Sequence, residues 1–226
     1  MVIRGFLHAL AEIQFSTLRD YSELMETSIK EKSEEHVQEL NALADKYPED
    51  MKQEFWDYNI DGLHQFYNDY PNLLRSSILV SCITNVEKTF IRLLSDLREN
   101  SDLKPVSINN KKLEGSDIEK VVQSIGEIID LSTTTNSDAW KDLILNIKIR
   151  NRVIHSNGVI HPKKYESLFT QIKEYELRNQ KFVALNQHHE IIFLEGYSEQ
   201  IIAISKNVVD GIIVSIQQDQ NNKTKK

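Results

Sequence analysis

The apolar positions of this chain recur mainly at helical spacing. In residues 72–99, apolar side chains follow one another at intervals of three and four, which places them on one face of a helix. Pro71 precedes that segment, Ser116 to Glu119 has the form of a capping box, and Ser137-Asp138 is a capping pair, so all three predict helix starts. Residues 2–46 predict one long helix, or two with a break near Ser33. Further helices are predicted at about 48–67, 116–130, 138–156, 161–178 and 198–218.

The remaining segments predict connections and one hairpin. Two short apolar stretches, 181–185 and 190–194, flank a polar turn at 186–189, which is typical of a β-hairpin. We predict an all-α fold: a helical bundle with one small β-hairpin before the C-terminal helix. Its predicted parts are an N-terminal helical extension (1–70) packed on the bundle, a main domain (71–220) and a disordered basic tail (221–226). Loops are expected at 100–115 and in the Thr-rich linker 131–136.

Composition is ordinary for a globular protein. The 226 residues are 40% hydrophobic and 27% charged. The single cysteine, Cys82, lies in an apolar run and predicts a buried thiol in a reducing compartment. No apolar run approaches the roughly 20 residues of a spanning helix, and the start does not resemble a signal peptide. We therefore expect a cytoplasmic protein with no membrane association.

The net charge changes what can be expected of nucleic-acid binding. A formal charge of −7 argues against general adhesion to nucleic acid, because neutralising phosphates requires clustered Lys and Arg. It leaves room for a small local basic cleft.

The predicted helix 138–156 carries polar side chains where its apolar stripe continues. The next positions on that face include Arg150, Asn151 and His155. A second apolar stripe on the opposite side predicts packing on both sides, so these polar groups are expected to be at least partly buried. Asn157-Gly158 predicts the helix end, with His155 in the last turn. The stripes are Trp140, Leu143, Ile144 and Ile147 on one side, and Leu145, Ile149 and Val153 on the other.

These side chains suit cleavage of RNA without a metal. Histidine can accept and donate a proton near neutral pH, and arginine can bind a phosphate or its developing charge. We assign His155 to proton transfer, Arg150 to the scissile phosphate, and Asn151 to orienting His155 or a phosphate oxygen. The 2′-hydroxyl of the RNA would attack phosphorus, giving a 2′,3′-cyclic phosphate and a 5′-hydroxyl.

The segment Arg150-Asn151-Arg152-Val153-Ile154-His155, with Asn157-Gly158 after it, resembles the signature of the HEPN superfamily. That signature is an Arg, a polar residue, and a His after four to six intervening residues. The helix that carries Ser76, Ser77 and Val86-Glu87 also resembles an earlier helix of the family, which often has an acidic residue facing the site. The resemblance covers roughly residues 72–218.

The resemblance implies a dimeric four- or five-helix bundle in which Arg and His of both copies face a shared cleft. It further implies a metal-independent endoribonuclease without a cofactor, commonly a toxin or phage-defence effector with an antitoxin or defence partner. By position Arg150, Asn151 and His155 carry over, with Glu87 as a supporting acid. A shared cleft also fits the geometry, because residues five apart on a straight helix point about 140° apart.

Alternatives remain for each of these residues. Arg150 and His155 could form a structural pair at a helix end, and Glu87 could be a solvated salt-bridge residue. Weaker candidates for RNA contact are Arg152, Lys148 and Arg75, which could equally be solvated. His188-His189 with His161 predicts a turn rather than a metal site, because no cysteine or carboxylate pattern accompanies them. For the whole chain, the alternatives are a catalytically inert HEPN-like adaptor that binds RNA or protein, or a toxin capped by an antitoxin.

Overall fold

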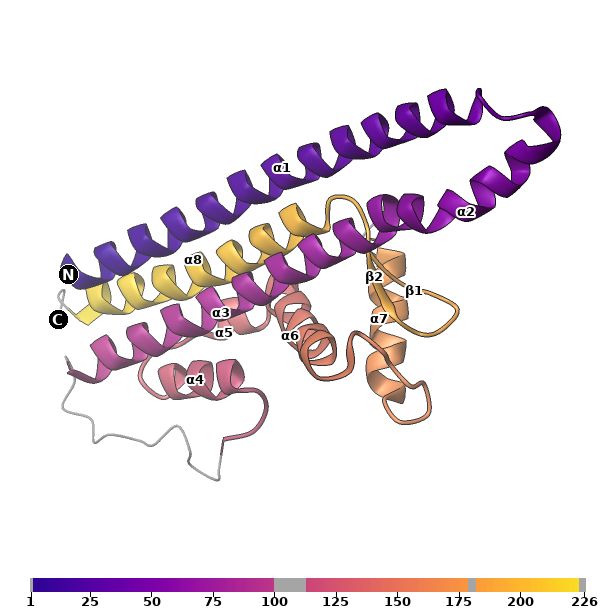
Figure 1. The fold of residues 1–226 in the computed structure, drawn as a ribbon. Helices are drawn as coiled ribbons and strands as arrows, with labels where there is room; N and C mark the ends of the chain where they lie inside the picture. The colour runs from indigo at the N-terminus through magenta and orange to yellow at the C-terminus, as the bar shows by residue number, and fades with distance from the viewer. Residues whose placement is uncertain (1, 100–112, 179–181, 224–226) are drawn as a thin grey trace.

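The computed structural model describes residues 2–99, 113–178 and 182–223, and it confirms the all-α fold. Three long helices form the body of the molecule: α1 (Val2–Ala44), α3 (Tyr70–Glu99) and α8 (Tyr197–Lys223). They lie side by side, and the start of α1 and the end of α8 lie at the same end of the bundle (Figure 1). Segments from the beginning, middle and end of the chain therefore share one core.

A second layer covers the side of α3 and α8 that faces away from α1 (Figure 1). It contains α4 (Asp117–Gly126), α5 (Ser132–Thr135) and α6 (Asp138–Ser156). Beyond α6 follow α7 (Glu166–Arg178) and the predicted hairpin, in which β1 (Val183–Leu185) pairs antiparallel with β2 (Ile191–Phe193). In the hairpin register, Val183 is opposite Phe193 and Leu185 is opposite Ile191.

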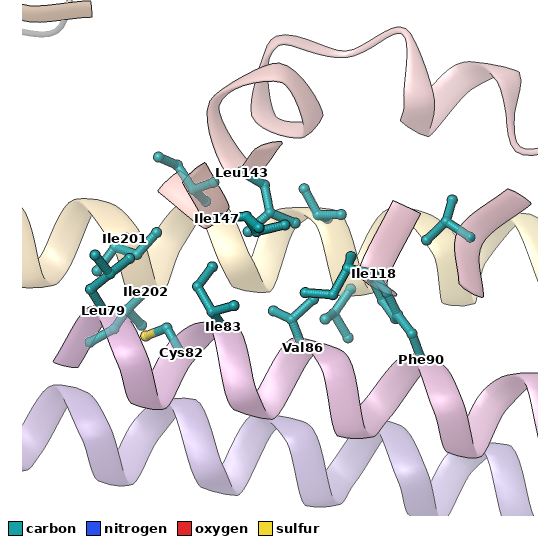
Figure 2. Packing of buried hydrophobic residues seen from close by; sticks show 14 of the residues in the cluster. Leu79, Cys82, Ile83, Val86, Phe90, Ile118, Leu143, Ile147, Ile201 and Ile202 are labelled. Carbon is teal, nitrogen blue, oxygen red and sulfur yellow. The ribbon is translucent and has the colours of Figure 1, made fainter. Parts of the chain in front are cut away.

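The core is centred on α3, most of whose apolar residues are buried between the two layers. Ile83 and Val86 are fully buried, and they point from α3 toward Leu143 and Ile147 of α6 and toward Ile118 of α4 (Figure 2). A fully buried apolar side chain of this size contributes about 1.5–3 kcal/mol relative to an exposed one. The three- and four-residue spacing read from the sequence is therefore the spacing of the core.

Helix α1 is continuous through Ser33, which is buried, so the expected alternative of two helices does not occur. Leu7, Ala11 and Phe15 belong to the same hydrophobic cluster as the core of α3 and α8. The core thus crosses the expected boundary at residue 70. In Figure 1 the far end of α1, together with α2 (Lys52–His64), extends beyond the rest of the bundle.

Pro71 lies at the start of α3 as predicted, but residues 68–71, expected to separate two helices, are themselves helical. A 3-10 turn (Glu49–Met51) leads into α2, and a π-helical turn (Gln65–Asp69) joins α2 directly to α3. Pro71 lies in the first turn of α3, where its missing N–H is tolerated. The aromatic residues Phe55 and Trp56 of α2 are partly exposed and contact each other edge to face at 5.5 Å between ring centroids.

The predicted caps are confirmed, whereas several boundaries differ. Ser116 forms a capping box with Glu119, and the Ser137 hydroxyl accepts a hydrogen bond from the Trp140 amide. The expected linker 131–136 contains the short helix α5. A Cβ on Gly211 would lie only 2.8 Å from Thr134 Oγ1, so the absence of a side chain at this glycine allows α5 to pack closely on α8.

The ends of other elements also shift. Helix α7 begins at Glu166 instead of at His161, because a turn precedes it in which the Lys164 and Tyr165 amides donate to the His161 carbonyl. Helix α8 continues to Lys223, so part of the expected tail 221–226 is helical, while 224–226 and most of the loop 100–115 lie outside the described residues. Among the described residues, no helix combines the length and apolar character that crossing a bilayer requires.

The buried Cys82 thiol yields a prediction. Burial raises the pKa of Cys82 to about 12, and a hydrogen bond with Ser205 opposes this only partly. Because the thiolate is the nucleophile, we expect iodoacetamide at about pH 8 to alkylate the folded protein more than about a hundredfold more slowly than the urea-unfolded chain. Mass spectrometry of timed samples measures both rates. Equal rates would contradict the burial of this thiol.

Candidate functional site

Helix α6 is held on α8 by a hydrogen bond inside the core. Asn146 is fully buried, its Nδ2 donates to the Asp142 carbonyl at 2.8 Å, and its Oδ1 accepts from the Tyr197 hydroxyl at 2.7 Å. Burial raises the pKa of Tyr197 well above its usual value, so this hydroxyl remains a donor at any ordinary pH. The sequence gives no sign of this pair, because Asn146 lies between the two apolar stripes of its helix and Tyr197 is 51 residues further along the chain.

The adjacent carboxylate of Asp142 is largely buried beside the more exposed Arg178. The Arg178 Nη2 lies 3.6 Å from Asp142 Oδ1. Burial raises the pKa of Asp142, and the positive charge of Arg178 lowers it to a smaller extent. This pair links α6 to the end of α7.

The structure brings Arg150, Asn151 and Glu87 together. The Arg150 side chain is 21% exposed and that of Glu87 31%, with 3.5 Å between Arg150 Nη2 and Glu87 Oε2. The Arg150 Nη1 donates to Asn151 Oδ1 at 3.2 Å. Within the described part of the chain, the buried Arg150 Nε has no hydrogen-bond partner. Both described contacts are long for a charged group, so this guanidinium is only loosely bound.

These three side chains line a small polar cavity of about 180 Å³. Ile83 and Ile147 also line it, and Ser116, Asp117 and Ile118 bring the N-terminus of α4 to the same place. This volume is below the roughly 300 Å³ at which small-molecule pockets begin, so the cavity has room only for a single group the size of a phosphate. The capping box marked the start of α4 in the sequence, but only the packing of α4 on α3 shows that it faces Arg150.

His155 is placed differently from the expectation. It is exposed in the last turn of α6, and the described residues that line the cavity do not include it. On a straight helix it lies about 7.5 Å along the axis from Arg150 and about 140° around it. The expected partial burial therefore holds for Arg150 and Asn151 and is wrong for His155, because the two-sided packing of α6 ends before its final turn.

The end of α6 is attached to the hairpin through Asn157-Gly158, the residues predicted to end this helix. Asn157 adopts a left-handed conformation with φ 48°, and Gly158 follows with φ 80°. The Gly158 amide donates to the Arg152 carbonyl at 3.1 Å, and the Ile191 amide donates to the Gly158 carbonyl at 3.1 Å. Together these two bonds attach the end of α6, shortly after His155, to β2.

The weaker candidates for RNA contact lie apart from this cavity. The Arg152 guanidinium carbon is 4.3 Å from the centroid of the Tyr165 ring, a cation–π contact. Lys148 is exposed and donates to Gln171 Oε1 at 3.1 Å. Arg75 binds both carboxylate oxygens of Glu26 at 2.7 Å and donates to the Phe193 carbonyl at 2.9 Å. With a side chain 11% exposed, Arg75 joins α1, α3 and β2 and is not brought to Arg150.

The comparisons with known proteins add nothing to this geometry: no family model, curated protein or solved structure matches the chain. The description of the site therefore rests on its own residues. Among the described residues, the group close enough to share a metal ion lies elsewhere, between α1 and α8.

The buried pair Asn146–Tyr197 can be tested directly. Tyr197→Phe leaves the Asn146 Oδ1 without its donor inside the core, and we expect the free energy of unfolding to fall by about 1–3 kcal/mol. Urea unfolding followed by circular dichroism measures it. The control is Tyr58→Phe, whose side chain is 88% exposed and which should change stability by less than about 0.5 kcal/mol. Equal stability of Tyr197→Phe and the wild type would rule out the role given to this bond.

Proposed function

We propose that the protein is a metal-independent endoribonuclease of HEPN type that acts as a toxin or phage-defence effector. The observation that carries the proposal is the loosely bound Arg150 guanidinium, which lines a phosphate-sized cavity on the helix that ends with exposed His155. Arginine is the side chain that best matches a phosphate, and histidine the one that best transfers protons near neutral pH.

The proposed reaction uses the RNA as its own nucleophile. The 2′-oxygen forms a bond to the adjacent phosphorus, and the bond from phosphorus to the 5′-oxygen breaks. His155 accepts the proton of the 2′-hydroxyl, and a second proton reaches the departing 5′-oxygen from water or from another imidazole. Arg150 stabilises the negative charge that develops on the phosphoryl oxygens. Asn151 and Glu87 keep the guanidinium near the cavity through the long contacts at 3.2 and 3.5 Å, which leave it able to bind a phosphate.

A homodimer is part of the proposal, because Arg150 and His155 of one copy diverge on α6. A two-fold axis near the end of α6 would place His155 of one copy opposite Arg150 of the other. Ile154, with 47% of its surface exposed beside His155, offers an apolar contact for such an interface.

The second candidate is a catalytically inert adaptor that binds RNA or a partner protein. The contact between Arg150 and Glu87 favours it, because a half-buried ion pair is also what a structural arginine would make. An antitoxin or other defence protein would then bind the exposed end of α6. The candidates differ in whether purified protein cleaves RNA.

Substitution of the two motif residues tests the ribonuclease. Wild type in EDTA should cleave RNA to a 2′,3′-cyclic phosphate and a 5′-hydroxyl, and Arg150→Ala or His155→Ala should lower the rate by at least about a hundredfold, a usual contribution of one acid–base group. Gel and mass-spectrometric analysis of a defined RNA measures both effects. Arg19→Ala and His188→Ala change exposed side chains of the same types and should leave the rate unchanged. No cleavage by wild type would favour the adaptor.

The shared site predicts complementation between the two inactive variants. If each site takes Arg150 from one copy and His155 from the other, a mixed dimer of the two variants keeps one intact site. Random exchange makes about half of the dimers mixed, so we expect about one quarter of the wild-type rate. Activity of the mixture is compared with that of each variant alone at equal total concentration. A mixture as inactive as its components would contradict a site built from two copies.

A further inference from the structure

Three side chains of types that commonly bind metal ions lie between α1 and α8, away from α6. His8 and Glu12 are one turn apart on α1, and Asp210 faces them from α8. The His8 Nε2 lies 2.8 Å from Asp210 Oδ1 and 3.8 Å from Glu12 Oε1. The ligand atoms of all three residues lie within 4.8 Å of one another. Figure 1 shows α1 and α8 running side by side.

These distances match the dimensions of a tetrahedral site. With metal–ligand bonds of about 2.0–2.2 Å, neighbouring ligand atoms are about 3.3–3.6 Å apart. The two distances from His8 Nε2, 2.8 and 3.8 Å, fall on either side of that range, so small rotations of exposed side chains would equalise them. The three side chains are 33–39% exposed, which leaves room for a water molecule as fourth ligand.

Lys206 now occupies the place of the cation. Its Nζ donates a hydrogen bond to Glu12 Oε1 and lies 3.4 Å from Asp210 Oδ2. The two carboxylates raise the pKa of Lys206, with the hydrogen bond that Lys206 donates to Glu12 as the largest cause, so the ammonium is retained. A lysine one turn from Asp210 on α8 can swing into solvent, which makes it a displaceable counter-ion rather than a permanent obstacle.

We propose that His8, Glu12 and Asp210 bind a late first-row divalent cation such as Zn²⁺, which clamps α1 onto α8. One imidazole and two carboxylates fit these ions, whereas Mg²⁺ and Ca²⁺ prefer oxygen ligands alone. The two carboxylates neutralise the charge of the ion once Lys206 has moved away. The site is separate from Arg150 and His155, so it does not depend on the proposed ribonuclease.

Zinc and cobalt titrations test the clamp on full-length protein from which any affinity tag has been removed and metal has been stripped. We expect one Zn²⁺ per chain in a competition assay with a chromophoric chelator, and a visible Co²⁺ absorption band typical of tetrahedral coordination. His8→Ala should weaken Zn²⁺ binding by about tenfold or more and abolish the band, since it removes one of three protein ligands. Zn²⁺ should also raise the Tm of wild type more than that of His8→Ala.

Substitutions at two further positions distinguish Zn²⁺ binding at this site from Zn²⁺ binding by an ordinary surface histidine. His64 also faces a single carboxylate, with 3.5 Å between its Nδ1 and Asp69 Oδ1, so His64→Ala is the matched control and should bind Zn²⁺ as wild type does. Lys206→Met removes the competing ammonium and should tighten binding by about tenfold, the effect of one partly screened charge. Lys206→Gln serves as a second replacement if circular dichroism shows that the Met variant is unfolded.

Binding of less than one Zn²⁺ per chain by the wild type would contradict the proposed metal site. So would equal losses of Zn²⁺ affinity in His8→Ala and His64→Ala. Unchanged or weaker binding in folded Lys206 variants would also overturn it. RNA cleavage in EDTA reports on Arg150 and His155 alone, so a failed clamp and a failed ribonuclease give different results.

Discussion

The architecture depends on the burial of α3 along most of its length. An apolar helix that is covered from several directions needs partners on each side, and this chain supplies α1 and α8 on one side and α4 and α6 on the other. No pair of these helices would exclude water from the residues between Leu74 and Leu97. The layered arrangement is therefore a consequence of one helix being too apolar to lie at a surface.

The same constraint creates the polar cavity. Helices α4 and α6 both pack on α3, so the N-terminus of α4 and the middle of α6 approach each other above Ile83. Arg150 and Glu87 lie at the margin of that contact, where the core gives way to solvent. Their partial burial follows from the layer geometry, and it gives the guanidinium an environment in which charge is less screened than at an open surface.

The features that the sequence predicted are those decided by neighbouring residues. Helical periodicity located α3 and α8, and side-chain capping located Ser116 and Ser137 as helix starts. Other features depend on distant partners: α5 requires the close approach of Gly211, and the burial of Asn146 requires Tyr197. The exposure of His155 could not be predicted from the apolar stripe of α6. A stripe shows which side of a helix is packed, but it does not show where along the helix the packing ends.

The meeting of α1 and α8 has a consequence for the order in which the protein forms. Helix α8 contributes Ile201, Ile202 and Val208 to a core whose other layers come from earlier parts of the chain. A chain emerging from the ribosome exposes these earlier helices before α8 can cover them. Helix α6 is fixed to α8 through Tyr197, so its orientation is also settled only then. Synthesis itself therefore delays the completed site until nearly the whole of this sequence has been translated.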